Sequence, residues 1–244
     1  MALFDKRGSS MLQIRKAGER GHAQLGWLNS FHTFSFGDYY DPNEMGWGPL
    51  RVINDDTVAA GKGFPTHPHR DMEIISYVLD GALAHKDSMG SGTEIRPGDV
   101  QMMEAGSGIA HSEFNASDKD PVHFLQIWVI PNLSGLEPSY QQHNFDDGEK
   151  RGRFRLVVSP QGADGSLRIH QDMAMYSALI DGDEAIDWTH DPKRLAYVHV
   201  ARGSLKVNGM DVGAGDGIRV ADESMLTFGN GNQAEVLLFD LPAN

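Results

Sequence analysis

The sequence of 244 residues contains no cysteine. Disulfide bonds, thiolate metal sites and a cysteine nucleophile are therefore excluded, and the absence fits a reducing compartment. The chain also lacks any apolar run close to the roughly 18–20 residues that span a bilayer. Residues 1–20 carry charges where a signal peptide has its apolar core, so we expect a cytoplasmic protein without a membrane span. Residues 1–10 are interpreted as an extension without recognisable chemistry.

Basic residues are scarce as well. The chain has 21 Lys and Arg against 34 Asp and Glu, which gives a formal net charge of −13. Because an acidic surface repels phosphate backbones, we do not expect direct binding of nucleic acid. The densest basic run comprises Lys150, Arg151, Arg153 and Arg155. We interpret it as a solvated linker or strand edge rather than a binding arm.

The chain does contain many short strand-like runs separated by turn dipeptides. No helical period is sustained long enough to indicate a strand–helix–strand unit. The turn signals recur at short intervals: Asp41-Pro42, Asp80-Gly81, Met89-Gly90 and Pro97-Gly98. This pattern predicts an all-β sandwich or barrel protein.

The two halves of the chain resemble each other weakly. The run 75–81, ISYVLDG, is similar to 197–203, YVHVARG, and each ends in a turn glycine. A polar segment rich in Pro and Gly separates the halves. We therefore expect an N-terminal domain over 1–132, a linker over 133–155 and a C-terminal domain over 156–244.

The strongest chemical signal lies between residues 61 and 115, where His67 and His69 form one pair and His111 and Glu113 another. Side chains two positions apart in a strand point to the same face. If the two strands meet, three imidazoles and a carboxylate converge, a set that suits a divalent transition metal. Histidines satisfied by buried hydrogen bonds are the alternative, but two pairs at this spacing, flanked by turn glycines, favour a metal.

The equivalent positions of the second half do not form such a set. They hold Thr189, Asp191, Phe228 and Asn230. One metal site is therefore expected, in the first half. His22 and His32 lack a nearby partner of ligand type in the sequence, so we interpret both as structural.

These residues resemble a known superfamily. The pattern Gly61-x5-His67-x-His69-x3-Glu73-x7-Gly81 is similar to the first cupin motif, and Gly98-x7-Gly106-x4-His111-x3-Asn115 to the second. The second departs from the general motif by Glu104 in place of proline and by a longer spacing from Gly106 to His111. The segments RGHAQLGWLNSFHTFSF, THPHRDMEIISYVLDG, PGDVQMMEAGSGIAHSEFN and RIHQDM together resemble the pirin family. The resemblance extends from about Leu12 to the C-terminal VLLFDLP and is greatest to compact bacterial pirins described as quercetin 2,3-dioxygenases.

The resemblance implies an all-β bicupin with two jelly-roll β-barrels, of which the second is degenerate and without metal ligands. Carried over to this chain, the family's metal ligands are His67, His69, His111 and Glu113. In many other cupins the carboxylate ligand occupies the position of Glu73, which also shares parity with His67 and His69. We prefer Glu113 as the ligand and expect Glu73 to orient an imidazole or tune the site.

The resemblance further implies a metal-dependent dioxygenase that cleaves the heterocycle of flavonols such as quercetin with dioxygen and releases carbon monoxide. We expect one divalent metal, iron(II) first, although copper, manganese, cobalt, nickel and zinc accept the same ligands. Glu113, or Glu73 nearby, is expected to accept the proton of the flavonol 3-hydroxyl. The alternative is a non-catalytic metal-binding redox sensor or protein-interaction cofactor that modulates transcription, which would require a protein partner.

Overall fold

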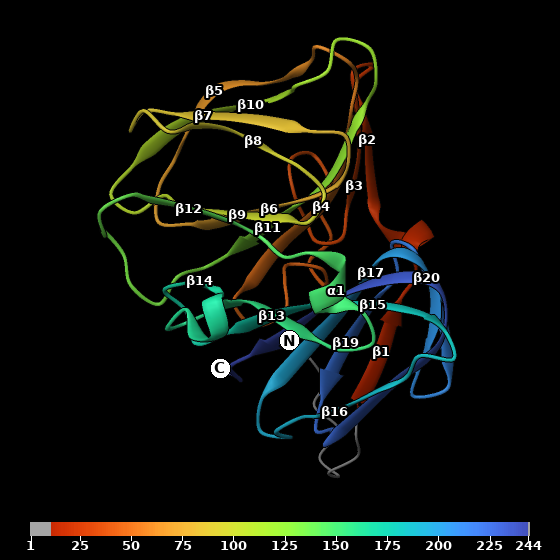
Figure 1. Ribbon diagram of the computed structural model, residues 1–244. Helices are drawn as coiled ribbons and strands as arrows, with labels where there is room; N and C mark the ends of the chain where they lie inside the picture. The colour runs from red at the N-terminus through yellow and green to blue at the C-terminus, as the bar shows by residue number, and fades with distance from the viewer. Residues whose placement is uncertain (1–10, 244) are drawn as a thin grey trace.

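The computed structural model describes residues 11–243, which form two β-barrels packed against each other (Figure 1). The extension expected over residues 1–10 lies outside the described residues. The longest helix in residues 11–243 has four residues, so none reaches across a bilayer. The expectation of an all-β protein is confirmed.

The first barrel consists of two antiparallel sheets that face each other. One is a seven-stranded sheet with the order β12 (Ser139–Asn144), β9 (Asp99–Glu104), β6 (Glu73–Asp80), β11 (Val122–Val129), β4 (Leu50–Val58), β3 (Leu28–His32) and β2 (Gly21–Gln24). The other is a four-stranded sheet with the order β5 (Gly63–His69), β10 (Ile109–Asn115), β7 (Leu83–Asp87) and β8 (Gly92–Ile95).

The second barrel is built from a nine-stranded sheet dominated by two long strands with several register shifts. Its main order is β1 (Met11–Arg15), β19 (Gly217–Ala221), β17 (Leu195–Val207), β20 (Met225–Leu241), β15 (Ala174–Gly182), β13 (Arg155–Ser159) and β14 (Leu167–Arg168). In addition β16 (Ile186–Thr189) pairs with β20, and β18 (Met210–Gly213) pairs with β17. Residues 11–243 also contain three short helices, η1 (Ala17–Glu19), α1 (Asp147–Lys150) and η2 (Ala163–Gly165).

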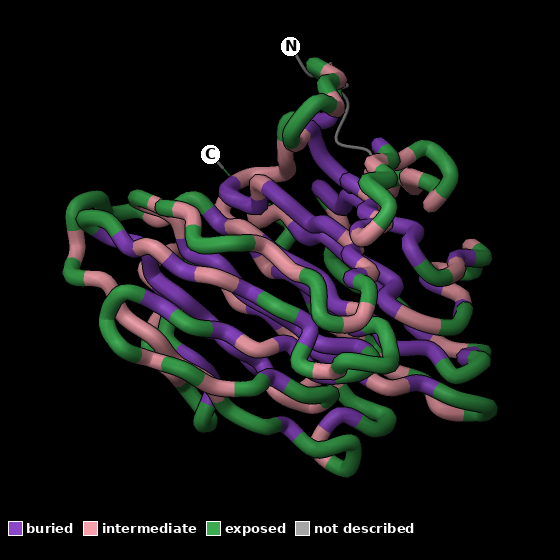
Figure 2. The backbone as a smooth tube through the Cα atoms, turned by 90° about the horizontal axis from the view of Figure 1, so that it is seen from above, coloured by how far each residue is buried: buried purple, intermediate pink, exposed green. Residues whose placement is uncertain are grey.

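The seven-stranded sheet is buried on both faces, because one face lines the first barrel and the other packs on the second. Seven consecutive residues of β6, from Glu73 to Leu79, are buried, and Figure 2 shows burial concentrated in the strand centres. Ile75 and Tyr77 belong to the core shared with Leu237 of the second barrel. Alternate residues such as Val78 pack inside the first barrel. The alternation of strand side chains thus separates the barrel interior from the interface between barrels.

Two strands lie outside the halves in which the sequence pattern places them. β1 pairs with β19 of the second barrel, although it precedes the first barrel in the chain. β12 lies within the segment expected as a linker, yet it pairs along its whole length with β9 of the first barrel. Both strands pair with edge strands and supply their missing backbone partners, which stabilises the junction.

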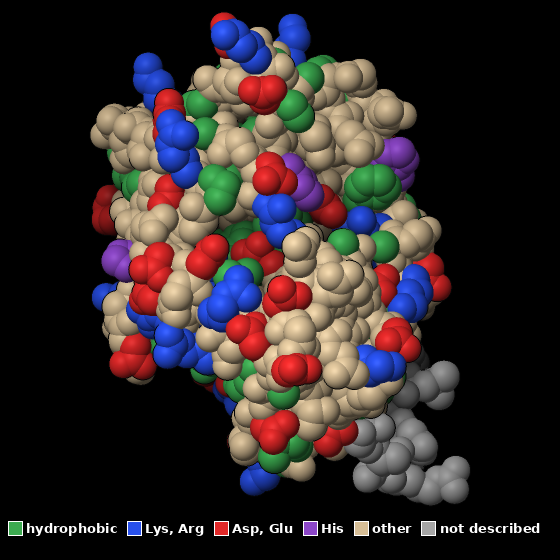
Figure 3. All heavy atoms as spheres, turned by 45° about the vertical axis from the view of Figure 1, so that its right-hand side comes forward, with side chains coloured by type: hydrophobic (Ala, Val, Ile, Leu, Met, Phe, Trp, Pro, Cys, Tyr) green, Lys and Arg blue, Asp and Glu red, His purple; other side chains and the backbone are tan. Residues whose placement is uncertain are grey.

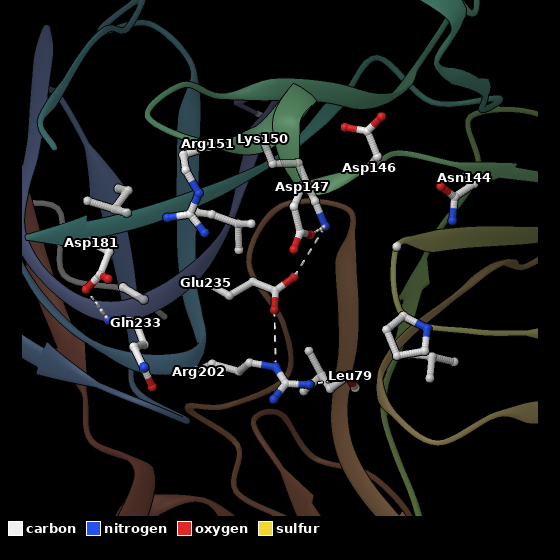
Figure 4. A pocket seen from close by; sticks show the side chains of 16 residues that line it. Leu79, Asn144, Asp146, Asp147, Lys150, Arg151, Asp181, Arg202, Gln233 and Glu235 are labelled. Atoms are coloured by element: carbon white, nitrogen blue, oxygen red, sulfur yellow. Dashed lines mark hydrogen bonds and ion pairs between the residues drawn. The ribbon is translucent and has the colours of Figure 1, made fainter.

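A cleft of about 660 Å³ lies between the barrels (Figure 4). Two of its basic side chains, Lys150 and Arg202, pair with Glu235, which also accepts a hydrogen bond of 2.5 Å from the Tyr77 hydroxyl. The Arg202 Nε lies 3.2 Å from Glu235 Oε2, and Lys150 Nζ lies 3.9 Å from Oε1. Lys150 is buried, so the interpretation of the basic run as a solvated linker is wrong at this position. Together with the Tyr77 hydrogen bond, these ion pairs link the connecting segment and both barrels, so we assign them a structural role.

The surface agrees with the acidic composition. On the face shown in Figure 3, acidic and basic side chains are interspersed and no large patch of one sign is present. This face offers no basic track of the kind that binds a phosphate backbone.

Candidate metal centre

Three histidines meet inside the first barrel. His67 and His69 lie on one face of β5, and the register of the sheet places His111 of β10 directly opposite His67. Ring nitrogens of the three residues all lie within 4.8 Å of one another. The Nε2 atoms of His67 and His111 are 3.1 Å apart. The convergence expected from the spacing of the histidines is therefore present.

The local sequence explains why the strands can take this arrangement. β5 is an edge strand, so Pro68 between the two histidines costs no hydrogen bond on its outer side. The pairing of β10 with β5 shifts register between His111 and Glu113, and the extra residue lies in β5 between Phe64 and His67. β10 itself pairs regularly with β7 there, so His111 and Glu113 keep the same face. Gly63 lies against this irregularity, and a Cβ at that position would be 2.2 Å from the Glu113 carbonyl oxygen. Only glycine therefore allows the two strands to approach there.

Hydrogen bonds on the far side of two rings orient the histidines. His67 Nδ1 lies 2.7 Å from the Pro65 carbonyl oxygen, which can only accept, so His67 carries its proton on Nδ1. His111 Nδ1 faces His85 Nδ1 at 3.4 Å, and His85 Nε2 lies 3.2 Å from Asp87 Oδ2. Because Asp87 accepts from His85 Nε2–H, His85 Nδ1 is the acceptor and His111 Nδ1 the donor. The Asp87–His85 pair thus holds His111 in one tautomer.

The donor set fits a cation. With both Nδ1 atoms protonated, the Nε2 atoms of His67 and His111 present lone pairs to each other at 3.1 Å. This contact is repulsive unless a positive charge lies between the two atoms. Burial, together with the neighbouring imidazoles, lowers the pKa of His111 to about 2 and that of His69 to about 4. These two rings are neutral at physiological pH, the state in which imidazole ligates a metal.

Glu113 lies beside the three imidazoles. Its carboxylate accepts hydrogen bonds from the Ser76 hydroxyl at 3.2 Å and from the Gln126 amide at 2.7 Å. Its Oε2 lies 3.9 Å from His111 Nε2, the atom that faces His67. Burial raises the pKa of Glu113 to about 7, although the two hydrogen bonds lower it in part. The donor atoms of Glu113, His85 and His111 lie within 4.8 Å of one another, so His111 belongs both to this group and to the group of three histidines. Nitrogen and carboxylate donors, the types that a divalent metal accepts, thus adjoin each other at His111.

Glu73 does not lie with these residues. It faces the second barrel, where its Oε1 accepts a hydrogen bond of 2.9 Å from the backbone of His170 and its neighbour across the sheet is Glu104. The expectation that Glu73 orients an imidazole of the metal site is wrong. The chain turns between β5 and β6 through Asp71, whose φ is 47°, so the strand parity that links Glu73 to His69 is lost.

His67 and His69 line a cavity of about 700 Å³ within the first barrel. Its walls are largely apolar and include Leu28, Phe36, Phe64 and Trp128. The Trp128 ring packs edge-on against His69 with centroids 5.1 Å apart. A cavity of this size, mostly apolar with a few convergent polar groups, is typical of a site for a small organic molecule.

Sequence reasoning missed His85. His22 and His32, which the sequence analysis interprets as structural, also line the cavity. His85 and Asp87 form a third pair at strand spacing, and that pattern in the sequence was the available signal. In the second barrel, Phe228 is part of the hydrophobic core. Among the described residues no group of metal-binding side chains lies inside that barrel.

Two β-barrels in one chain, with an imidazole cluster inside the first, define a bicupin. Two family models match the chain, one described as Pirin over residues 13–129 and one as Quercetinase C-terminal cupin domain over residues 156–241. The chain belongs to the pirin family. The bicupin fold and the family expected from the sequence are both confirmed.

Characterised relatives match over nearly their whole length. The quercetin 2,3-dioxygenase of Escherichia coli K12 is 47% identical over 232 residues, which cover 95% of this chain and 99% of the relative. A pirin-like protein of Caulobacter vibrioides is 40% identical over 231 residues, covering 94% and 99% of the two chains. The crystal structure of the E. coli bacterial pirin YhhW in complex with nickel(II) has a TM-score of 0.91 at 45% identity, covering 96% of this chain and 100% of that one. Together with the histidine cluster of this chain, this nickel complex supports a divalent metal as the cofactor.

Proposed function

We propose that this protein is a metal-dependent dioxygenase that cleaves the heterocycle of a flavonol with dioxygen and releases carbon monoxide. The observation that carries the proposal is the cluster of His67, His69 and His111, two of which, His67 and His69, line a largely apolar cavity of about 700 Å³. A flavonol is flat, mostly apolar and of a size that such a cavity accommodates. The E. coli relative with 47% identity is named quercetin 2,3-dioxygenase, which supports the same chemistry here.

The proposed ligands are His67, His69, His111 and Glu113, and iron(II) is our first candidate for the ion. A divalent metal bound there acts as a Lewis acid for the flavonol oxygens and brings substrate and dioxygen together. Four protein ligands leave up to two positions of an octahedral ion open, unlike a closed structural site. Asp87 and His85 then act on the ion only through His111, by keeping its Nε2 unprotonated.

Glu113 is the proposed proton acceptor for the flavonol 3-hydroxyl. It lines the cavity beside the imidazoles, so its carboxylate can accept a proton from a substrate hydroxyl held at the metal centre. Ser76 and Gln126 hold one oxygen each and fix the carboxylate in place. Phe36, Phe64 and the other apolar walls exclude water from the substrate.

The raised pKa of Glu113 predicts how metal affinity depends on pH. Below pH 7 a proton occupies the carboxylate that the metal requires, so the affinity for nickel(II) should fall by about tenfold per pH unit as the pH decreases from 7. His69 and His111 add nothing to this slope near neutrality, because their pKa values lie at about 4 and 2. Titration calorimetry between pH 6 and 8 measures the slope. In Glu113→Gln the slope should flatten, and an unchanged slope in this variant would assign the proton to another group.

The reaction itself is tested by anaerobic reconstitution with iron(II), followed by addition of quercetin and then oxygen. We expect loss of flavonol absorbance together with release of carbon monoxide, and neither in protein without metal. The same assay repeated with copper, manganese, cobalt, nickel and zinc identifies the active ion. If the metals bind but quercetin persists with each of them, the dioxygenase proposal fails and the redox sensor becomes the better account.

A further inference from the structure

A row of polar side chains crosses the inner face of the seven-stranded sheet. The strand registers place His32 of β3 opposite Asn54 of β4, Asn54 opposite Gln126 of β11, and Gln126 opposite Ser76 of β6. At one end of this row Ser76 and Gln126 hold the Glu113 carboxylate. At the other end His32 and Asn54 have no such partner. The metal centre therefore accounts for only half of the row.

Asp56 adds a further polar side chain at the end of the row formed by His32 and Asn54. It follows Asn54 on the same face of β4, and the register places it opposite Ser30, which hydrogen-bonds its carboxyl group. The side chains of His32, Asn54 and Asp56 are 5%, 2% and 3% exposed. One polar atom of each, His32 Nδ1, Asn54 Oδ1 and Asp56 Oδ1, has no hydrogen-bonding partner among the described residues.

All three residues line the same cavity as His67, His69 and Glu113. Buried polar atoms are almost always hydrogen-bonded, and leaving them unpaired is costly. Water can meet this requirement in the free protein, and a ligand that fills the cavity must replace it. A ligand that occupies the cavity from the metal centre to this wall therefore needs polar groups at both ends.

The charge of the wall defines those polar groups. Among the described residues that line the cavity there is no lysine or arginine, whereas Asp38, Asp56 and Glu113 are acidic. A phosphate or carboxylate would meet these carboxyl groups without a counterion. The Asn54 and Asp56 oxygens instead accept hydrogen bonds, and phenolic hydroxyl groups are neutral donors that an apolar cavity tolerates.

We propose that His32, Asn54 and Asp56 form a second recognition site of the cavity, which binds hydroxyl groups on a ring of the substrate remote from the atom held at the metal centre. The preferred substrate is then an aromatic molecule with ring hydroxyl groups in addition to the metal-binding one. This inference rests on the proposed function, because it takes the flavonol 3-hydroxyl to lie at the metal centre.

The test is a comparison of ligands and variants by anaerobic binding to the nickel-loaded protein, which requires no turnover. The ligands are 3-hydroxyflavone without other hydroxyl groups, one analogue hydroxylated on the phenyl ring and one hydroxylated on the fused ring. We expect the wild-type protein to bind one of the two hydroxylated analogues about 10- to 100-fold more tightly than the parent compound. The analogue that gains affinity also identifies the ring that faces Asp56.

The variants are Asn54→Leu and Asp56→Leu, with Asn132→Leu as the matched control, because Asn132 is exposed and outside the cavity. In each cavity variant the ratio of the affinity for the preferred hydroxylated analogue to that for 3-hydroxyflavone should fall towards one. The affinity for unsubstituted 3-hydroxyflavone itself should change by no more than a few-fold. Asn132→Leu should keep the full preference. Asp56→Asn, which retains the side-chain shape, replaces Asp56→Leu if circular dichroism shows loss of structure, and should reduce the preference in part.

The outcomes separate this inference from the proposed function. A preference that persists in both cavity variants overturns the second recognition site, even if quercetin is cleaved. A preference that is lost as expected, in a protein that releases no carbon monoxide from quercetin, supports the site and overturns the dioxygenase reaction. If none of the three flavonols binds, both proposals fail.

Discussion

Replacement of His111 by alanine is expected to remove both the metal and the activity. His111 lies at the centre of the cluster, with Nε2 3.1 Å from that of His67 and 3.9 Å from Glu113 Oε2. Loss of its ring removes a proposed ligand and leaves His85 without the Nδ1–H that it accepts. Changes to residues outside the ligand shell typically reduce metal affinity by about 10- to 100-fold, so loss of the central ligand should exceed about 100-fold. Nickel(II) titration and metal-dependent quercetin turnover measure the two effects.

Two further variants should show an intermediate loss of metal affinity and no loss, respectively. His85→Ala removes only the group that orients His111, so metal affinity should fall within the range of about 10- to 100-fold. His143→Ala changes an exposed histidine at the end of β12 and should leave affinity and turnover as they are. Equal losses in His85→Ala and His111→Ala would show that His111 is not a ligand, because then removing the ring costs no more than misorienting it. A metal affinity retained in His111→Ala would place the metal elsewhere.

The His67–His69 and His111–Glu113 pairs could be found in the sequence because each lies within one continuous strand. Period-two alternation then suffices to place both members of a pair on one face. Their meeting depends on the pairing of β5 with β10, which the cupin motifs imply and the register confirms by setting His111 opposite His67. The register shift after His111 does not disturb this, because Glu113 still enters the barrel.

The same rule fails where the backbone leaves the extended conformation. Asp71 interrupts the alternation between His69 and Glu73, so the shared parity of these residues has no structural meaning. Glu73 instead faces the second barrel with Glu104 and His170, three residues whose proximity depends on the packing of the two halves. No spacing within one half could indicate that cluster.

The polar row is harder still to predict. His32, Asn54, Gln126 and Ser76 come from four strands separated by long stretches of chain, and only the relative registers of those strands bring them into line. A shift of one residue in any pair would turn that side chain to the other face. The pairing of β1 with β19 is equally hard to predict from the sequence, because the two strands are separated by about 200 residues.

Glu113→Gln should reduce turnover strongly in protein that is kept saturated with metal. Glutamine cannot accept the 3-hydroxyl proton, and loss of a positioned general base typically costs about 10²- to 10⁴-fold. The variant should still fold, because glutamine can accept the Gln126 hydrogen bond through its oxygen while its NH2 group donates to the Ser76 hydroxyl. Turnover is measured at saturating metal and quercetin, with metal content determined in the same sample. Undiminished turnover would show that Glu113 is not the base.

Glu73→Gln is the informative control, because the sequence alone left Glu73 as the other candidate for the same role. Its carboxylate is held between the barrels by the backbone of His170, on the opposite face of β6 from Ser76, which contacts Glu113. The change should therefore leave metal affinity and turnover close to those of the wild-type protein. If Glu73→Gln lost turnover while Glu113→Gln kept it, the base would lie on the other face of the sheet. The proton would then have to cross the buried sheet from the cavity to the interface between the barrels.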